Sequence, residues 1–139
     1  MFTKYYCRWA QTLSTKLKVT FTPDYPDPMT IPSSSDRFVH HVLFYTPATA
    51  SEADNATLLE GLQKLAGISV IKMSHIGTPA PTNRDVIERT YTYSWLCLFE
   101  NAAAEEEYQQ HPIHDEFRNE YARYWEKVVI YDSIGSLSN

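Results

Sequence analysis

The feature that most constrains the fold is a run of residues, TYTYSWLCLF at positions 90–99, whose side chains alternate between two faces. Such alternation, in a run rich in aromatic residues and threonine, is typical of a β-strand. One face carries Tyr91, Tyr93, Trp95, Cys97 and Phe99, and the other carries Thr90, Thr92, Ser94, Leu96 and Leu98. Because large apolar side chains lie on both faces, both faces of this strand must be largely covered.

Length and charge limit the classes of protein to which this strand can belong. The chain has 139 residues, 43% of them apolar, which suits one compact globular domain with its own core. A net charge of −5 gives no electrostatic footprint for nucleic acid or for an anionic membrane surface. The sequence has neither the roughly 18 consecutive apolar residues of a membrane span nor the apolar segment of a signal peptide, so we expect a soluble, cytoplasmic protein.

Few residues are placed to hold a metal or an organic cofactor. Cys7 and Cys97 are too far apart for a Cys-based zinc site. Pro112 interrupts the helix that would bring His111 and His114 together, and no third ligand is spaced with them. Only four glycines are present, and no Gly-rich phosphate-binding motif occurs. We therefore expect no metal and no cofactor.

A proline-rich stretch divides the chain. Half of the eight prolines fall between positions 23 and 32, and three serines follow, so this stretch reads as an extended linker. We expect an N-terminal arm with its linker over residues 1–36 and a folded domain over residues 37–135. The aromatic residues Phe2, Tyr6 and Trp9 predict that the arm docks onto an apolar surface of the domain or of a partner subunit.

The folded domain is predicted to have the order βαββααβ. We expect strands over 38–45, 68–76, 90–99 and 127–133, and helices over 51–66, over 101–110 and from Pro112 onward. Ser51 and Asp54 fit a capping box, Asn101 fits an N-cap, and Pro112 suits the first turn of a helix. This order suits a ferredoxin-like α+β fold, in which an antiparallel four-stranded sheet has helices on one face.

The other face of such a sheet needs a cover. Either a second copy of the chain packs sheet on sheet, or the arm covers the face. We expect the face with Tyr91, Tyr93 and Trp95 to be buried between subunits, or the opposite face if the register is out by one residue.

Two histidines are candidates for chemistry. His40 and His41 are neighbours on one strand, so they point to opposite faces, and only one of them can enter a pocket. His40 shares its face with Phe38, Val42 and Phe44, which favours an enclosed imidazole. His114 falls in the first turn of a helix, where a second positive charge is disfavoured, so a neutral imidazole that accepts a proton is expected. The alternative interpretation is structural: a satisfied core histidine at His40, and a hydrogen bond to the backbone at His114.

Several segments together resemble a known family. They are FVHHVLFY at 38–45, LLEGL at 58–62, YSWLCLFE at 93–100, YQQHPIHDEF at 108–117 and WEKVVIYD at 125–132. The pattern over residues 38–133 is similar to that of the stress-responsive dimeric α/β-barrel (Dabb) family, and the Tyr-x-x-His-Pro-x-His-x-x-Phe element is its most specific part. The resemblance implies a ferredoxin-like fold and a homodimer whose two sheets form a barrel.

The resemblance also implies site residues. The plant polyketide cyclases of this family use no metal or organic cofactor, and their acid–base set corresponds by position to His40, Tyr108 and His114. The cyclases also place a tyrosine on the first helix, where this sequence has Leu62. We therefore expect a pocket more apolar than theirs and no aldol cyclisation of a linear polyketide. Its walls are expected to include Phe38, Val42, Leu62, Phe117 and Trp125.

Three functions follow as alternatives. The first is a dimeric protein with a small apolar pocket for a hydrophobic or aromatic molecule, with cofactor-free acid–base chemistry where it acts as an enzyme. The second is a non-catalytic structural or assembly protein of the stress response. The third is an enzyme resembling the barrel monooxygenases or the polyketide cyclases.

Overall fold

The computed structural model describes residues 36–135, which form a sheet with helices on one face. The predicted arm, with the docking expected of Phe2, Tyr6 and Trp9, lies outside the described residues. The antiparallel sheet has the strand order β2-β3-β1-β4. Its strands are β1 (Phe38–Tyr45), β2 (Met73–Gly77), β3 (Tyr93–Phe99) and β4 (Lys127–Ile134). This is the predicted ferredoxin-like α+β fold.

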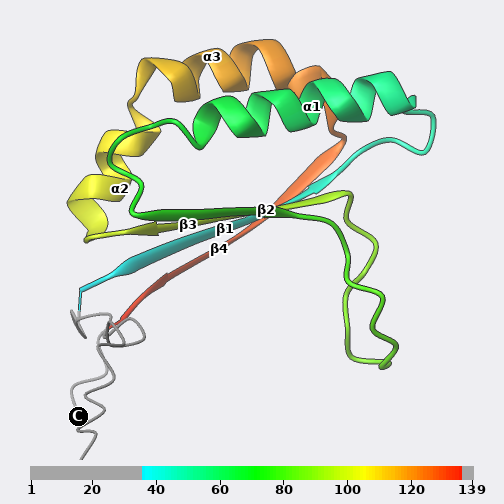
Figure 1. The fold of residues 1–139 in the computed structure, drawn as a ribbon, viewed down its shortest axis with the longest axis horizontal. Helices are drawn as coiled ribbons and strands as arrows, with labels where there is room; N and C mark the ends of the chain where they lie inside the picture. Colours follow the sequence, from blue (N-terminus) through cyan, green and yellow to red (C-terminus); the bar gives the residue numbers. More distant parts are fainter. Residues whose placement is uncertain (1–35, 136–139) are drawn as a thin grey trace, which may run out of the picture. The chain divides into compact units, whose positions relative to one another are not determined.

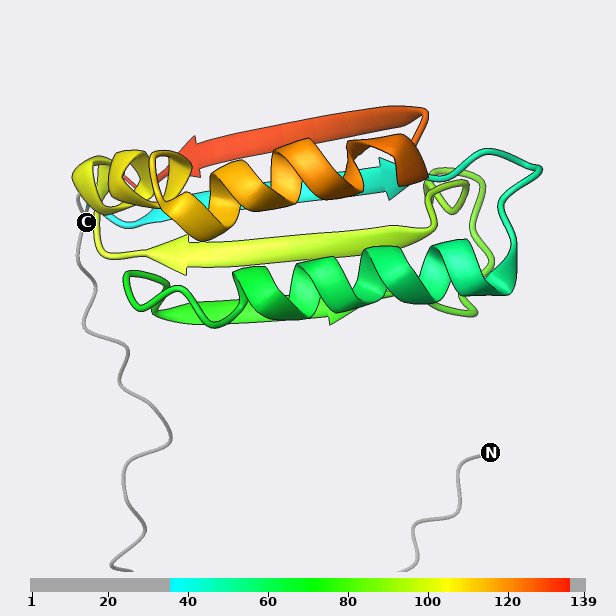
Figure 2. The same cartoon turned by 90° about the horizontal axis from the view of Figure 1, so that it is seen from above.

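The helices lie together on one face of this sheet (Figure 1). They are α1 (Glu52–Leu65), α2 (Ala102–Gln109) and α3 (Pro112–Tyr121), and a 3-10 turn, η1 (Ala122–Tyr124), follows α3. Seen from above, α1 runs over the β2 side of the sheet and α3 over the β1 and β4 side (Figure 2). None of the helices in this part of the chain is long and apolar enough to cross a membrane.

Local sequence signals begin the helices where predicted. At α1 the Ser51 hydroxyl accepts a hydrogen bond from the Asp54 backbone, and the Asp54 carboxylate accepts one from the Ser51 backbone. At α2 the Asn101 side-chain oxygen accepts a hydrogen bond from the Ala104 backbone. The break between α2 and α3 falls at His111, whose Nδ1 accepts from the backbone of Ile113, and Pro112 opens α3.

Two predicted strands are shorter in the structure. The strand predicted over 68–76 begins only at Met73, because the chain after α1 makes turns in which Ile68 bonds to Leu65 and Ile71 bonds to Ile68. Ile68 is nevertheless buried in the core. The strand predicted over 90–99 begins at Tyr93, so Tyr91 belongs to the loop before it.

The structure also decides which face of β3 is covered by the helices. Trp95, Cys97 and Phe99 are buried in the core beneath the helices, and Tyr93 packs against that core. The first expectation, that the Tyr93 and Trp95 face lies between subunits, is therefore wrong. The helix-free face of β3 is the opposite one, with Ser94, Leu96 and Leu98. Alternation within one strand cannot decide between the faces, because only packing against the helices distinguishes them.

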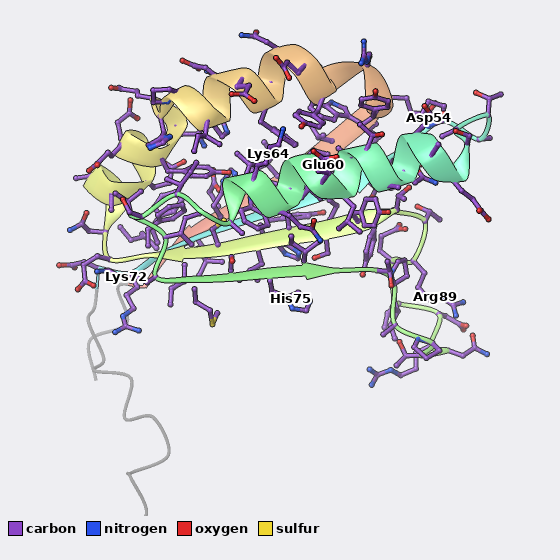
Figure 3. The ribbon with its side chains drawn as sticks, turned by 45° about the horizontal axis from the view of Figure 1, so that its top comes forward. Asp54, Glu60, Lys64, Lys72, His75 and Arg89 are labelled. Carbon is purple, nitrogen blue, oxygen red and sulfur yellow. The ribbon has the colours of Figure 1, made fainter. Side chains whose placement is uncertain are left out.

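The helix layer fits closely at one position. Gly61 in α1 lies against α3, and a Cβ atom there would stand 2.7 Å from Tyr121 Cδ1 and 2.9 Å from Phe117 Cε2. The absence of a side chain lets the two helices approach each other. Beside it Lys64 donates a hydrogen bond of 2.8 Å to the Tyr121 hydroxyl, and the lysine points toward α3 in Figure 3. These contacts hold α3 in place above the sheet.

Candidate functional site

A cavity of about 250 Å³ lies between α3 and the β1 and β4 side of the sheet. Most of its wall is apolar, and the polar groups are two histidines, one tyrosine, one glutamine and one arginine. The lining residues are His40, Val42, Phe44, Leu65, Trp95, Tyr108, Gln109, His114, Phe117, Arg118, Trp125, Val128 and Ile130. The three predicted acid–base residues are thus brought together at one cavity.

His40 enters the cavity from β1 and is held by a carboxylate. His40 is 4% exposed, and its Nδ1 lies 2.7 Å from Asp132 Oδ1. Asp132 is directly opposite His40 in the pairing of β1 with β4, so strand register brings the two side chains together. A carboxylate only accepts hydrogen bonds, so the Nδ1–H is donated to Asp132, and a neutral imidazole keeps its lone pair on Nε2.

Tyr108 comes from α2 and is 1% exposed. The indole Nε1–H of Trp95 donates a hydrogen bond of 3.1 Å to its hydroxyl oxygen. Burial raises the pKa of Tyr108 well above its usual value, so the phenol is neutral at physiological pH. The bond from Trp95 uses a lone pair of the phenol oxygen, and the phenol proton remains for donation to another acceptor.

His114, the third residue of α3, supplies a lone pair. Burial, and next the charges of Arg118 and His40, lower the pKa of His114 to about 4, against the opposing effect of a hydrogen bond to the Gln109 backbone. The ring is therefore neutral at pH 7, as predicted, with desolvation as the main cause. Its Nδ1 is buried and has no hydrogen-bond partner among the described residues. A neutral imidazole has one ring nitrogen with a free lone pair, so the His114 ring can accept a proton.

The three rings form a connected group. The Tyr108 ring centroid lies 4.7 Å from that of His114 and 5.9 Å from that of His40. The group combines a neutral phenol that can donate a proton with imidazole nitrogens that can accept one. Such a combination can take a proton from a carbon next to a carbonyl while a hydrogen bond stabilises the oxygen of the enolate.

The predicted walls of the pocket are only partly those observed. Val42, Phe117 and Trp125 line the cavity as expected. Leu62 and Phe38 do not line it. Leu62 is fully buried in the core, and the contribution of α1 to the cavity comes from Leu65, almost one turn later. The reason is the placement of α1, which runs over the β2 side of the sheet (Figure 2), whereas the cavity is lined by α3, β1 and β4.

Sequence reasoning missed three polar residues at this site, Gln109, Arg118 and Asp132. Asp132 follows Val128 and Ile130 on the same face of β4, so a carboxylate on an otherwise apolar face was the available signal. Arg118 is four residues after His114, which places it on the same side of α3. Asp132 can be assigned to His40 only from the pairing of β1 with β4, and Arg118 can be assigned to the cavity only from the packing of α3 on the sheet.

The remaining histidines lie elsewhere. His41 is on the helix-free face, as its strand position predicts, and its Nε2 is 2.8 Å from Ser94 Oγ. His75 points away from the helices (Figure 3). His111 caps α3 through Nδ1. Across residues 36–135 no group of three or more histidine, cysteine, aspartate or glutamate side chains is arranged to hold a metal ion.

Comparison with known proteins gives a family and a fold. The family model described as "Stress responsive A/B Barrel Domain" (Dabb) matches residues 38–134. The protein At3g17210 from Arabidopsis thaliana is 26% identical, with a TM-score of 0.59 and coverage of 69% of this chain and 92% of that one. Among curated proteins no match is found.

Two further structures share the fold. The hydroxynitrile lyase from Passiflora edulis is 20% identical, with a TM-score of 0.60 and coverage of 72% of this chain and 94% of that one. A dimeric ferredoxin-like protein of unknown function from Thermobifida fusca is 19% identical, with a TM-score of 0.59 and coverage of 73% and 92%.

Proposed function

Because this chain belongs to the stress-responsive A/B barrel (Dabb) family, we propose that it is a homodimer whose subunits each bind a small hydrophobic or aromatic molecule in the α3 cavity. The observation that carries this proposal is the convergence of His40, Tyr108 and His114 on a cavity with mainly apolar walls. Few polar groups in an apolar enclosure are what small-molecule sites generally have. An apolar cavity of about 150 Å³ is enough for benzene, so the larger volume here suits a molecule of one or two rings.

Binding is tested by closing the mouth of the cavity. Val128 lines it from β4 and is 38% exposed, so Val128→Trp adds bulk at the mouth without overpacking the core. Ile134→Trp is the matched control, because Ile134 lies on the same face of β4 and outside the cavity lining. With 2-naphthol as a neutral probe in a fluorescence titration, we expect Val128→Trp to weaken binding about tenfold or more and Ile134→Trp to leave it unchanged. Equal affinities in all three proteins would place the bound probe elsewhere.

We further propose that the same three residues perform cofactor-free acid–base chemistry. In a ketone bound at the cavity, the neutral imidazole of His114 removes a proton from the carbon beside the carbonyl, and the Tyr108 hydroxyl donates a hydrogen bond to the oxygen that gains the electron pair. Asp132 is a positioning residue that holds His40. Among structures of this fold, the protein from Passiflora edulis is a hydroxynitrile lyase, so catalysis on this architecture has a precedent.

The chemistry is tested by proton exchange of 2-tetralone in deuterated buffer, followed by NMR. We expect the protein to accelerate the loss of the protons beside the carbonyl, and His114→Gln to remove most of that acceleration. Since the pKa of His114 is lowered to about 4, the His114-dependent rate should stay level between about pH 5 and 7 and fall below that range. His75→Gln, on the other face of the sheet, is the control. Exchange that His114→Gln leaves unchanged would make the protein a binding protein only.

A non-catalytic assembly role is the second candidate, and the helix-free face of the sheet favours it. Leu43 is 7% exposed there, and Val39, Leu96 and Leu98 are only partly exposed. Within the four strands this face presents no carboxylate and one lysine, Lys127. A face of this kind suits a second copy packed sheet on sheet. The similar protein from Thermobifida fusca is itself described as dimeric.

A further inference from the structure

One residue gives the cavity an electrostatic preference. Among residues 36–135, Arg118 is the only lysine, arginine, aspartate or glutamate that lines the cavity. It lies four residues after His114 on α3, so the two side chains occupy the same side of the helix, about one turn apart. Its side chain is 56% exposed, whereas the His114 residue is 8% exposed. The guanidinium therefore stands at the mouth of the cavity and the imidazole stands inside.

The guanidinium is available to a ligand. Its partner among the described residues is the exposed carboxylate of Asp115, which accepts a hydrogen bond from Nη2. A pair in which both side chains are about half exposed contributes at most about 1 kcal/mol, so exchanging it is inexpensive in free energy. A guanidinium has five N–H donors in a planar fork, which suits a second carboxylate bound through two parallel hydrogen bonds.

The inner end of the cavity does not suit an anion. His114 lies there as a neutral imidazole, because burial lowers its pKa to about 4, and it offers an anion no positive charge. The indole N–H of Trp95 is already donated to Tyr108. The adjoining walls are the apolar side chains of Val42, Phe44 and Phe117. A charged group placed there would lose its hydration without gaining a cationic partner, which is costly.

We propose that the natural occupant is an apolar carboxylic acid of one or two rings, with its carboxylate on Arg118 at the mouth and its apolar body inside. This inference rests on the cavity being a ligand site, as proposed above. It narrows that proposal from any small apolar molecule to the ionised acids, and it makes Arg118 the residue that determines specificity.

The proposal connects ligand charge with the proton acceptor. The charged and titratable groups that face His114 are Arg118 and Asp115 on its own helix, Tyr108 on α2 and His40 on β1, the last of which bonds to Asp132 on β4. The positive charge of Arg118 helps to keep the pKa of His114 low. A carboxylate bound to Arg118 offsets that charge, so the pKa of His114 should rise when an anion is bound and stay unchanged with a neutral ligand.

The test compares two probes of similar size and shape, anionic 2-naphthoate and neutral 2-naphthamide, titrated at neutral pH into the full chain and into two variants. Arg118→Gln removes the guanidinium from an exposed position. Arg84→Gln makes the same change of net charge in the exposed loop between β2 and β3 and is the control. We expect the wild-type protein and Arg84→Gln to bind the naphthoate about tenfold or more tightly than the amide. In Arg118→Gln we expect the preference to disappear through loss of naphthoate affinity alone.

Two results would overturn this inference while leaving the binding function intact. They are equal affinity of the wild-type protein for both probes, and a preference for the naphthoate that persists in Arg118→Gln. Failure of 2-naphthol, the naphthoate and the amide alike to bind would instead refute the ligand site itself. The pKa of His114 can be followed through its ring protons by NMR. A pKa that rises with the naphthoate and not with the amide would support the link between Arg118 and His114.

Discussion

Replacing Leu96 with lysine is expected to convert the proposed homodimer to a monomer. Leu96 is central on the helix-free face, where strand register places it directly between His41 on β1 and His75 on β2. An ammonium group buried there has no carboxylate within the four strands to pair with, and the twofold symmetry of a dimer would bring a second charge of the same sign into the interface. We expect the dissociation constant of the dimer to increase about 100-fold or more.

Light scattering at micromolar concentration measures this effect. Ala103→Lys is the matched control, because it adds the same charge at an exposed position of α2 on the other side of the domain. The monomer of Leu96→Lys should keep its far-UV circular dichroism, since the side chain at position 96 is partly exposed in the single subunit. A wild-type protein that is monomeric would contradict the homodimer, and a Leu96→Lys variant that stays dimeric would move the interface to another surface.

Acidification from about pH 7 to pH 5 is expected to lower the free energy of unfolding by about 2 kcal/mol through His114 alone. The pKa of this histidine is about 4 in the folded protein, while an unfolded histidine titrates near 6.5. Between these values the unfolded chain binds the extra proton and the folded chain does not, so stability rises with pH across this window. The contribution is complete above the unfolded pKa and is lost as the pH falls toward the folded one.

Urea unfolding of the wild-type protein and of His114→Gln at several pH values isolates this contribution. At pH 7 the free energy of unfolding of the variant should be about 1 kcal/mol lower, because the hydrogen bond to the Gln109 backbone is lost. Nδ1 adds nothing to this loss, because it has no partner among the described residues. At pH 5 the variant should equal or exceed the wild-type protein in stability. Burial lowers the pKa of His41 as well, so both proteins keep a slope of the same sign, and the difference between their slopes is the result. Equal slopes of the free energy of unfolding against pH in the two proteins would show that the pKa of His114 is not lowered in the folded state.

The strands and helices could largely be predicted because their signals lie within each element. The alternation at 38–45 set the bounds of β1 and placed His40 and His41 on opposite faces, as the structure has them. The Ser51 and Asp54 capping box and the proline at position 112 fixed the starts of α1 and α3. The strand predicted over 68–76 was too long, since an apolar residue such as Ile68 can be buried from a turn as well as from a strand.

The candidate site was predictable only in part, for a different reason. The resemblance to the family pointed to His40, Tyr108 and His114, and the structure brings these residues to one cavity. The resemblance also placed Leu62 in the wall, where the packing of α1 puts Leu65 instead. That the protein does not cyclise a linear polyketide, because Leu62 replaces the tyrosine of the cyclases, stays a prediction.

By itself the sequence determined the order of the elements, the faces within each strand and the break between α2 and α3, because these depend on backbone preferences and on side chains a few residues apart. Only the tertiary structure decided which face of β3 meets the helices, that Asp132 holds His40, and that Arg118 lines the cavity. The physical reason is that these contacts join side chains on separate elements, up to 92 positions apart, as in the His40 and Asp132 pair. Periodicity in one segment carries no information about the register or orientation of another.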